Sequence, residues 1–187
     1  GIKTPGRKDL VLIEVAADTT CAAVFTRNAF CAAPVTVARE NLHASAYQPR
    51  YLLINTGNAN AGTGDAGIAA ARACLQAVAS VAGVDAHCVL PFSTGVIGEP
   101  LPVQKLEQAV PAAHSALSAD GWLAAAEGIL TTDTRPKAHS VSFQCDGDDF
   151  VVTGIAKGAG MIRPNMATML AYIATDMAVE QSLLQAM

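Results

Sequence analysis

Short apolar runs, bounded by glycine, asparagine, aspartate or proline, recur along the chain and predict strands. The first two runs are separated by Asp18 and Thr19, which predict a turn and therefore an antiparallel hairpin. The last two runs are separated by Asp-Gly-Asp-Asp, which is another hairpin signal. The predicted strands cover residues 9–15, 21–26, 51–55, 88–92, 140–145 and 150–155.

Helices are predicted from apolar residues at helical spacing and from the residues that begin them. Proline is favoured in the first turn of a helix, so Pro102 is expected to open one helix and Pro111 the next. Ser118 has a side chain that caps helix N-termini and predicts a helix that carries Trp122. Residues 33–41 fit a strand or a helix equally well. The expected helices cover residues 67–81, 101–110, a segment from 111, a segment after 118 and the last residues of the chain.

The order of these elements predicts the fold class. Two strands come first, helices and strands then alternate, and a second hairpin follows. This order indicates an α+β or mixed α/β fold with at least one largely antiparallel sheet covered by helices. Because we find no internal repeat and no low-complexity linker, residues 1–187 are expected to form a single domain. The chain opens without methionine and stops within a helical pattern, so we expect a fragment of a longer precursor.

Composition narrows the class of protein. Of the 187 residues, 51% are hydrophobic and 15% are charged, which favours a compact core over disorder. The net charge of −4 and the few aromatic residues argue against nucleic-acid binding. No apolar run is long enough to span a membrane, and the opening residues lack the apolar core of a signal peptide. We therefore expect a cytoplasmic protein without a nucleic-acid or membrane partner.

The five cysteines do not have the spacing of a metal site. None forms a Cys-x-x-Cys pair, and no cysteine and histidine have the spacing of zinc ligands, so no metal is expected. Buried free thiols in a reducing compartment are the simpler interpretation. The cysteines are Cys21, Cys31, Cys74, Cys88 and Cys145.

The loop at residues 55–67 contains a literal G-x-G-x-x-G pattern. Gly62, Gly64 and Gly67 lie between a predicted strand and a predicted helix, with Asp85 further on, as in a dinucleotide-binding fingerprint. However, several residues separate the strand from the first glycine, and Asp85 precedes its strand. A non-catalytic nucleotide-binding module is therefore one hypothesis, and a loop that needs positive φ angles and local hydrogen bonds is the other.

Two further loops combine small residues with hydroxyl groups. After the strand that ends at Phe92, Ser-Thr-Gly has the residue types of an oxyanion hole, although alone it is a plain turn. Residues 129–137, Ile-Leu-Thr-Thr-Asp-Thr-Arg-Pro-Lys, place hydroxyls, a carboxylate and cations after a predicted helix. Alone, that loop is more simply a helix end that caps itself.

The fourth loop, from Lys157 to Leu170, suggests why a threonine follows a small residue. Because Ala167 does not shield its own carbonyl, a Thr168 hydroxyl held against it can attack and shift the acyl group from nitrogen to oxygen. Hydrolysis of the ester then cuts the chain and frees a threonine amine. Such an amine has a pKa of about 7.7–8.0 and can serve as the base for its own hydroxyl. For an arbitrary Ala-Thr pair, an ordinary strand residue is the better interpretation.

Taken in order, the four loops resemble the ornithine acetyltransferase family, the bifunctional glutamate/ornithine N-acetyltransferases of arginine biosynthesis. The resemblance covers essentially the whole chain and rests on long motifs. It implies an N-terminal-nucleophile-like fold and a precursor that cleaves itself before threonine, so that 1–167 is an α chain and 168–187 the start of a β chain. The motifs are NTGNANAGTG, STGVIGEPLP, TTDTRPK and KGAGMIRPNMATML.

The resemblance also implies roles for individual residues. Thr168 is the nucleophile and Ala167–Thr168 the bond that is cut. Thr94 and Gly95 form the oxyanion hole. The amino-acid substrate is bound by Thr131, Lys157 and Thr168, and Thr132 is a near neighbour of Thr131 in the same motif.

The activity that the resemblance implies is transfer of acetyl from N2-acetylornithine to glutamate through an acetylated Thr168. No bound cofactor is expected, and acetyl-CoA is a further substrate if the protein is bifunctional. The expected partner is its own β chain in an α2β2 assembly. The alternatives are an N-terminal-nucleophile aminopeptidase of related fold and the nucleotide-binding module described above. If the chain is uncleaved, the Thr168 nitrogen is an amide and cannot act as the base.

Overall fold

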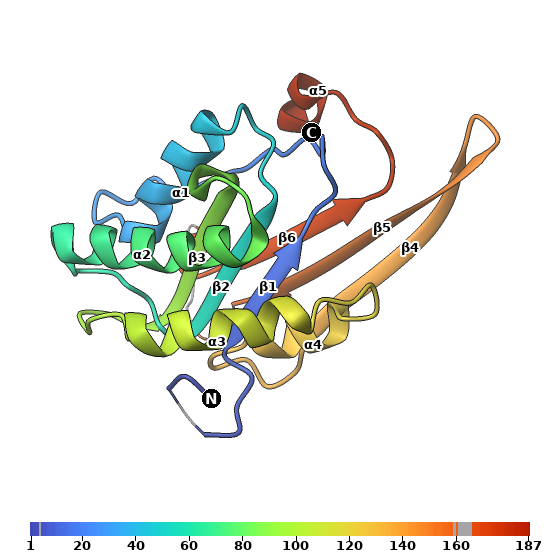
Figure 1. Cartoon of the computed structure of the whole chain (residues 1–187). Coiled ribbons are helices and arrows are strands. Elements are labelled where there is room, and N and C mark those ends of the chain that lie inside the picture. Colours follow the sequence, from blue (N-terminus) through green and yellow to red (C-terminus); the bar gives the residue numbers. More distant parts are fainter. Residues whose placement is uncertain (4, 159, 161–165) are drawn as a thin grey trace.

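A computed structural model describes residues 1–3, 5–158, 160 and 166–187. Within these residues, the chain forms two three-stranded sheets and five α-helices (Figure 1). Their bounds are β1 Leu10–Glu14, α1 Ala33–Ala44, β2 Tyr51–Asn58, α2 Gly64–Ala82, a 3-10 turn Ala86–Cys88, β3 Val89–Val96, α3 Val103–Ser115, α4 Trp122–Gly128, β4 Lys137–Cys145, β5 Asp148–Lys157, β6 Leu170–Thr175 and α5 Gln181–Ala186.

The first sheet has the strand order β1-β2-β3, with β2 in the centre. β1 runs antiparallel to β2, whereas β3 runs parallel to β2 because α2 carries the chain back to the start of the sheet. Side chains alternate across the sheet along β2. Tyr51 and Leu53 point to one core, and Leu52 and Ile54 point to the other. This strand is therefore apolar on both faces, as the buried strand predicted at residues 51–55 requires.

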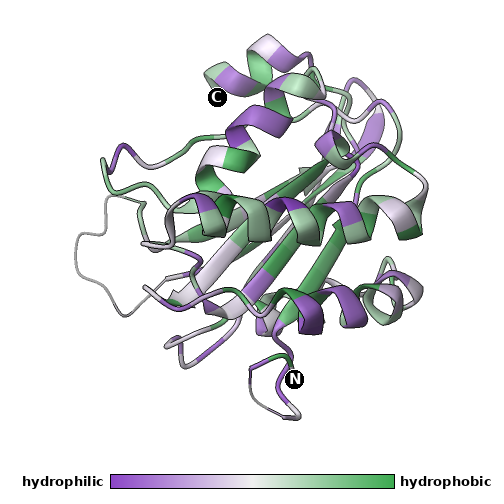
Figure 2. Ribbon diagram, turned by 60° about the vertical axis from the view of Figure 1, so that its left-hand side comes forward, coloured by the Kyte–Doolittle hydropathy of each residue, from purple (hydrophilic) through white to green (hydrophobic). Residues whose placement is uncertain are grey.

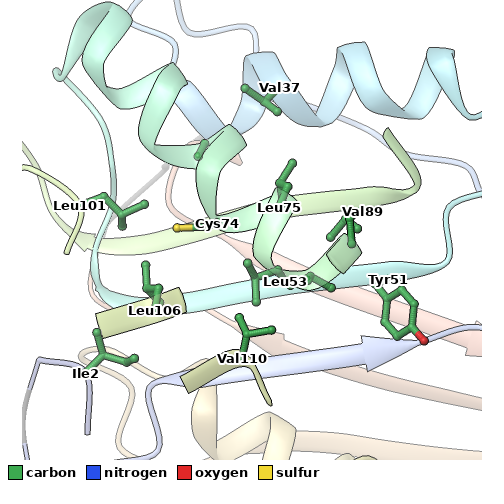
Figure 3. Packing of buried hydrophobic residues seen from close by; sticks show 13 residues of the cluster. Ile2, Val37, Tyr51, Leu53, Cys74, Leu75, Val89, Leu101, Leu106 and Val110 are labelled. Carbon is green, nitrogen blue, oxygen red and sulfur yellow. The ribbon is translucent and has the colours of Figure 1, made fainter. Parts of the chain in front are cut away.

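Helices α1, α2 and α3 cover one face of the first sheet (Figure 1). Figure 3 shows Leu75 of α2 and Leu106 and Val110 of α3 directed toward Leu53 and Val89 of the strands. All five side chains are almost completely buried. Burying a side chain of this size contributes about 1.5–3 kcal/mol, so this layer is a main source of stability.

The second sheet, β4-β5-β6, is antiparallel throughout and packs against the other face of the first. Ile155 of β5 and Tyr172 of β6 share a core with Val11 and Ile54. The Tyr172 ring meets the Phe92 ring edge to face, with 5.1 Å between their centroids. The two sheets are thus joined by direct side-chain contact.

The β4–β5 hairpin extends beyond the rest of the molecule (Figure 1). Its turn is formed by Asp146 and Gly147, both at positive φ, which fits the hairpin predicted there. In Figure 2, the strands of the sheets carry long hydrophobic stretches, whereas hydrophilic and hydrophobic residues alternate along the helices. Among the described residues, no helix is long and apolar enough to cross a membrane.

The predicted N-terminal hairpin is wrong. Residues 21–26 form no strand, and β1 pairs with β2 instead. The Cys21 N–H donates to the Tyr47 carbonyl (2.8 Å), and the Thr20 hydroxyl donates to the carbonyl of Val179 (2.8 Å). Tertiary contacts therefore outweigh the local strand preference of this apolar segment.

Several helix predictions also need correction. Residues 33–41 lie in α1, and α2 begins at Gly64, three residues earlier than predicted. Pro111 lies inside α3 and starts no new helix. Ser118 does not cap α4; its hydroxyl accepts a hydrogen bond from the Asp120 N–H in the preceding turn. Strand β6 was not predicted.

The cysteines are all free, but their burial varies. Cys74 is buried within the helical layer, and burial, helped by the charge of Glu107, raises its pKa to about 12. Cys145 is exposed, so the expectation of burial is wrong for that residue.

Candidate active site

Alternation along two strands brings the predicted site residues together. In β3, Phe92 faces the second sheet, and Thr94 follows it on the same side. In β5, Ile155 faces the first sheet, and Lys157 follows it on the same side. The two strand ends therefore place Thr94 and Lys157 against each other, although they are 63 residues apart in sequence.

Lys157 connects two of the predicted catalytic positions. Its ammonium group donates to the Thr94 hydroxyl oxygen (2.9 Å) and to the Thr168 carbonyl oxygen (3.0 Å). Only 4% of Lys157 is exposed. This burial lowers the pKa of Lys157 below its ordinary value of 10.5, while the charge of Asp133 opposes the shift and that of Lys137 adds to it. A solvated surface lysine is therefore ruled out.

The Lys157 contact also orients the Thr94 hydroxyl. An ammonium group can only donate, so the Thr94 oxygen is the acceptor in this pair. The hydroxyl hydrogen consequently points to some other acceptor. A donor held in this way is what an oxyanion hole requires.

Gly95 follows Thr94 where β2 and β3 lose their regular register. Its φ is +136°, and a Cβ at this position would lie 2.3 Å from the carbonyl carbon of Gly57. Only glycine fits this conformation and this close approach. The register shift at Gly57 and Asn58 changes the direction of the end of β3. Bulges commonly have this effect near active sites.

The Ala167–Thr168 bond lies in the middle of a turn. The Met169 N–H donates to the Met166 carbonyl (3.3 Å), and Met166 has a positive φ of 65°. Ala167 is exposed and Thr168 is half-buried. The turn thus presents the bond between them at the surface, while the Thr168 carbonyl is held from inside by Lys157.

The Thr131–Asp133 loop reaches the same region through Asp133, which the sequence analysis did not select. Asp133 accepts a hydrogen bond from the Gly158 N–H (3.0 Å), so it contacts the residue after Lys157. The Thr132 hydroxyl oxygen lies only 2.6 Å from where a Cβ on Gly160 would be. For Thr131, the described residues show no such contact; its carbonyl oxygen is 3.5 Å from an Arg7 nitrogen. A buried aspartate among exposed polar residues carries no sequence signal of its own.

The ArgJ family pattern matches residues 1–187 in full. The chain belongs to the ArgJ family. This match confirms the resemblance to the family, and the sheets and helices described above confirm the α+β fold class.

Curated relatives of this chain are named arginine biosynthesis bifunctional protein ArgJ. The arginine biosynthesis bifunctional protein ArgJ of Pseudomonas syringae pv. tomato is 61% identical over 185 residues, which is 99% of this chain and 45% of that protein. The ArgJ protein of Methylococcus capsulatus is 60% identical over 184 residues, which is 98% of this chain and 44% of that protein. The chain therefore spans less than half the length of these curated relatives.

Two solved structures have the same fold. The crystal structure of ArgJ from Bacillus halodurans has a TM-score of 0.80 and 36% identity, and the match covers 91% of this chain and 86% of that one. The structure of ornithine acetyltransferase complexed with ornithine, from Mycobacterium tuberculosis, has a TM-score of 0.73 and 33% identity, with 93% and 88% covered.

The residues of the G-x-G-x-x-G pattern and its loop make local structural contacts. Asn60 is fully buried; its amide donates to the Gly67 carbonyl (2.9 Å) and its side-chain oxygen accepts from the Thr63 hydroxyl (2.9 Å). A Cβ on Gly67 would lie 1.9 Å from that hydroxyl oxygen. Asn58 donates to the carbonyls of Glu99 and Pro100 (3.1 and 3.0 Å). These contacts fit the hypothesis of a structural loop, in which glycines provide positive φ angles and asparagines bond to the backbone.

Clusters suited to a metal ion were sought across residues 1–3, 5–158, 160 and 166–187. Within these ranges, no three histidine, cysteine, aspartate or glutamate side chains lie close enough to hold one. The groups that the site does offer are hydroxyls, an ammonium and backbone amides, which suit acyl transfer.

Proposed function

We propose that the protein is an acetyltransferase that moves the acetyl group of N2-acetylornithine to glutamate through an acetylated Thr168. The observation that carries the proposal is the buried Lys157 ammonium, which joins the Thr94 hydroxyl to the Thr168 carbonyl. The names of its relatives, which are arginine biosynthesis proteins and an ornithine acetyltransferase, support the same activity.

Self-cleavage is the proposed first step. The Thr168 hydroxyl oxygen attacks the Ala167 carbonyl carbon, the peptide C–N bond breaks, and an ester with a free amine results. Water then hydrolyses the ester, which leaves the Ala167 carboxylate and the Thr168 hydroxyl. The exposed turn at Met166–Met169 supports this step because it leaves the Ala167 carbonyl unshielded. The structure is that of the continuous chain, in which the Thr168 nitrogen is still an amide.

Acetyl transfer follows in two half-reactions. The new Thr168 amine takes the proton from its own hydroxyl, which attacks the acetyl carbonyl; ornithine leaves with a proton on its nitrogen. The glutamate amine then attacks the acetyl ester and regenerates Thr168. The Thr94 hydroxyl and the Gly95 N–H stabilise the oxyanion in both steps, and each such donor contributes roughly 3 kcal/mol.

Substrate binding is assigned to Thr131, Lys157 and Thr168. Lys157 is the only cation in this set and pairs with a substrate carboxylate, a contact strengthened by charge. The remaining roles extend the same proposal: acetyl-CoA as a second acetyl donor, no bound cofactor, a cytoplasmic location, and an α2β2 assembly of residues 1–167 with a β chain that begins at Thr168.

The test is the intact mass of the full-length gene product under denaturing conditions. We expect two polypeptides that meet at Ala167–Thr168 in the wild type and one uncut polypeptide for Thr168→Ala. Thr168→Ser is the matched control, because serine keeps a hydroxyl and should still cleave. A folded wild-type protein that stays uncut would remove the basis of the mechanism.

The second half of the test is the transfer itself. The cleaved protein, given N2-acetylornithine and glutamate, should form ornithine and N-acetylglutamate in equal amounts. Release of free amino acids from peptides, with no acetyl passed to glutamate, would instead identify an N-terminal-nucleophile aminopeptidase.

A further inference from the structure

The side chain of Asp133 is buried, although the residue as a whole is partly exposed. Its side chain has 0% exposure. One carboxylate oxygen accepts both the Gly158 N–H (3.0 Å) and the Lys137 ammonium (2.5 Å). The other oxygen is buried without a hydrogen-bond partner among the described residues. Burying a carboxylate is costly unless it is paired and hydrogen-bonded, so the position of Asp133 calls for an explanation.

The hydrogen bond that Asp133 accepts comes from Gly158, the residue that follows Lys157. Gly158 has a φ of +128°, and a Cβ there would lie 2.8 Å from Met169 Cγ. The backbone is therefore confined at this point, and Asp133 holds its N–H. Because Lys157 is adjacent, the same contact fixes where the Lys157 side chain leaves β5.

We propose that Asp133 is a positioning residue whose buried carboxylate holds the Gly158 N–H and thereby keeps the Lys157 ammonium against Thr94 and the Thr168 carbonyl. The TTDTRPK motif thus contacts the backbone just after Lys157 at two points. Asp133 accepts the Gly158 N–H, and Thr132 packs on Gly160. The inference deepens the proposed function, on which its catalytic consequence rests.

Charge gives Asp133 a second effect on Lys157. Among the described residues, the charged groups that act on the Lys157 ammonium are Asp133 and Lys137, with opposite signs. Asp133 favours the protonated amine, and Lys137 opposes it. Removing the Asp133 charge should therefore lower the pKa of Lys157, and removing the Lys137 charge should raise it. A general loosening of the structure would not produce two shifts of opposite sign.

The experiment uses three variants of the full-length protein. Asp133→Asn keeps an oxygen acceptor for the Gly158 N–H but removes the charge. Asp133→Ala removes both. Lys137→Gln, at an exposed position, is the matched control that removes only the cation beside Asp133.

The first readout does not depend on catalysis. Trace acetylation with acetic anhydride, followed by mass spectrometry across pH, gives the pH at which Lys157 becomes reactive, with the exposed Lys8 as internal reference. In Asp133→Asn we expect this pH to fall by about one unit. In Lys137→Gln it should rise. Identical Lys157 profiles in the wild type and Asp133→Asn, or shifts of the same sign in both variants, would overturn the inference.

The second readout is amide exchange in the wild type, which needs no variant to fold. The Gly158 amide should be protected because it donates to a buried carboxylate, and rapid exchange would contradict the proposal.

The third readout is acetyl transfer. Asp133→Ala should lower kcat/KM about tenfold or more, Asp133→Asn less, and Lys137→Gln hardly at all. Equal activities in the wild type and Asp133→Ala would refute the catalytic consequence. If the wild type transfers no acetyl group, the proposed function fails, while labelling and exchange still decide the role of Asp133.

Discussion

Two loops that follow central strands use their polar groups in opposite ways. The asparagine loop, residues 58–67, leads from β2 into the first turn of α2. Its asparagines bond to backbone carbonyls, as Asn58 does at Glu99 and Pro100, or to other groups of the loop, as Asn60 does. The lysine loop begins at Lys157, at the end of β5, and reaches Thr168 before β6. Its lysine bonds to Thr94, far away in sequence, and to Thr168 across the loop.

This difference separates a structural loop from a candidate catalytic one. In the asparagine loop, Asn60 uses its amide and its carbonyl oxygen within seven residues of itself. In the lysine loop, a buried charge is held by a hydroxyl and a carbonyl, and within the described part of the chain no carboxylate is in hydrogen-bond contact with it. Such an arrangement does not favour stability, so function is the better explanation for it.

Replacement of Lys157 by methionine tests this comparison most severely. We expect kcat/KM to fall about a thousandfold, which corresponds to a loss of roughly 4 kcal/mol of transition-state stabilisation. Truncating one partner of a buried charged contact costs about 2–5 kcal/mol of binding free energy. Methionine has a similar volume and no charge to bury, so the free energy of unfolding should stay within about 1 kcal/mol of wild type. Urea unfolding and steady-state kinetics on the same sample check both halves. A large loss of stability would make Lys157 a structural residue.

Thr94→Val should have the next largest effect. Valine keeps the shape of threonine but lacks the hydroxyl, so kcat should fall about 10²-fold or more if Thr94 stabilises the oxyanion. Thr94→Ser keeps the donor and should retain most of the activity. Acetyl-transfer kinetics of the pair would argue against an oxyanion role if the two variants were equally active.

Asn60→Ala should give the opposite result to Lys157→Met. The substitution leaves the Gly67 carbonyl and the Thr63 hydroxyl without their partner, so we expect a loss of about 2–3 kcal/mol of stability. Activity per folded molecule should be unchanged. Thermal and urea unfolding measure the first effect, and nucleotide titration should show no saturable binding. Loss of activity without loss of stability would reverse our assignment of this loop.

The smallest expected effect is a pH dependence of the difference in unfolding free energy between the wild type and Lys157→Met. Because the pKa of Lys157 is lowered on folding, the unfolded chain binds more protons between the folded value and 10.5. The stability of the wild type relative to Lys157→Met should therefore rise with pH across that window. Below the folded pKa, the full burial cost of the charge remains. Urea unfolding of both proteins at neutral and alkaline pH measures the change, and a difference that falls as pH rises would contradict the burial argument.

The sequence by itself determined the features that depend on neighbouring residues. Residues 51–54 are apolar on both faces and indicated the buried strand predicted at 51–55, and Asp146-Gly147 favours the turn of the β4–β5 hairpin. The four loop motifs, taken in order, were specific enough to indicate the family. Each of these signals is local, so no knowledge of the tertiary structure was needed.

Only the tertiary structure decided which segments meet. Residues 21–26 have the composition of a strand, but β2 took the place beside β1. Asp133 was passed over because its burial and its bond to Gly158 arise only when its loop packs against the end of β5. The contact between Thr94 and Lys157 spans 63 residues and exists because two sheets pack face to face. Propensity and periodicity act over one or two turns of chain, whereas such contacts depend on how the packed layers bury their surfaces.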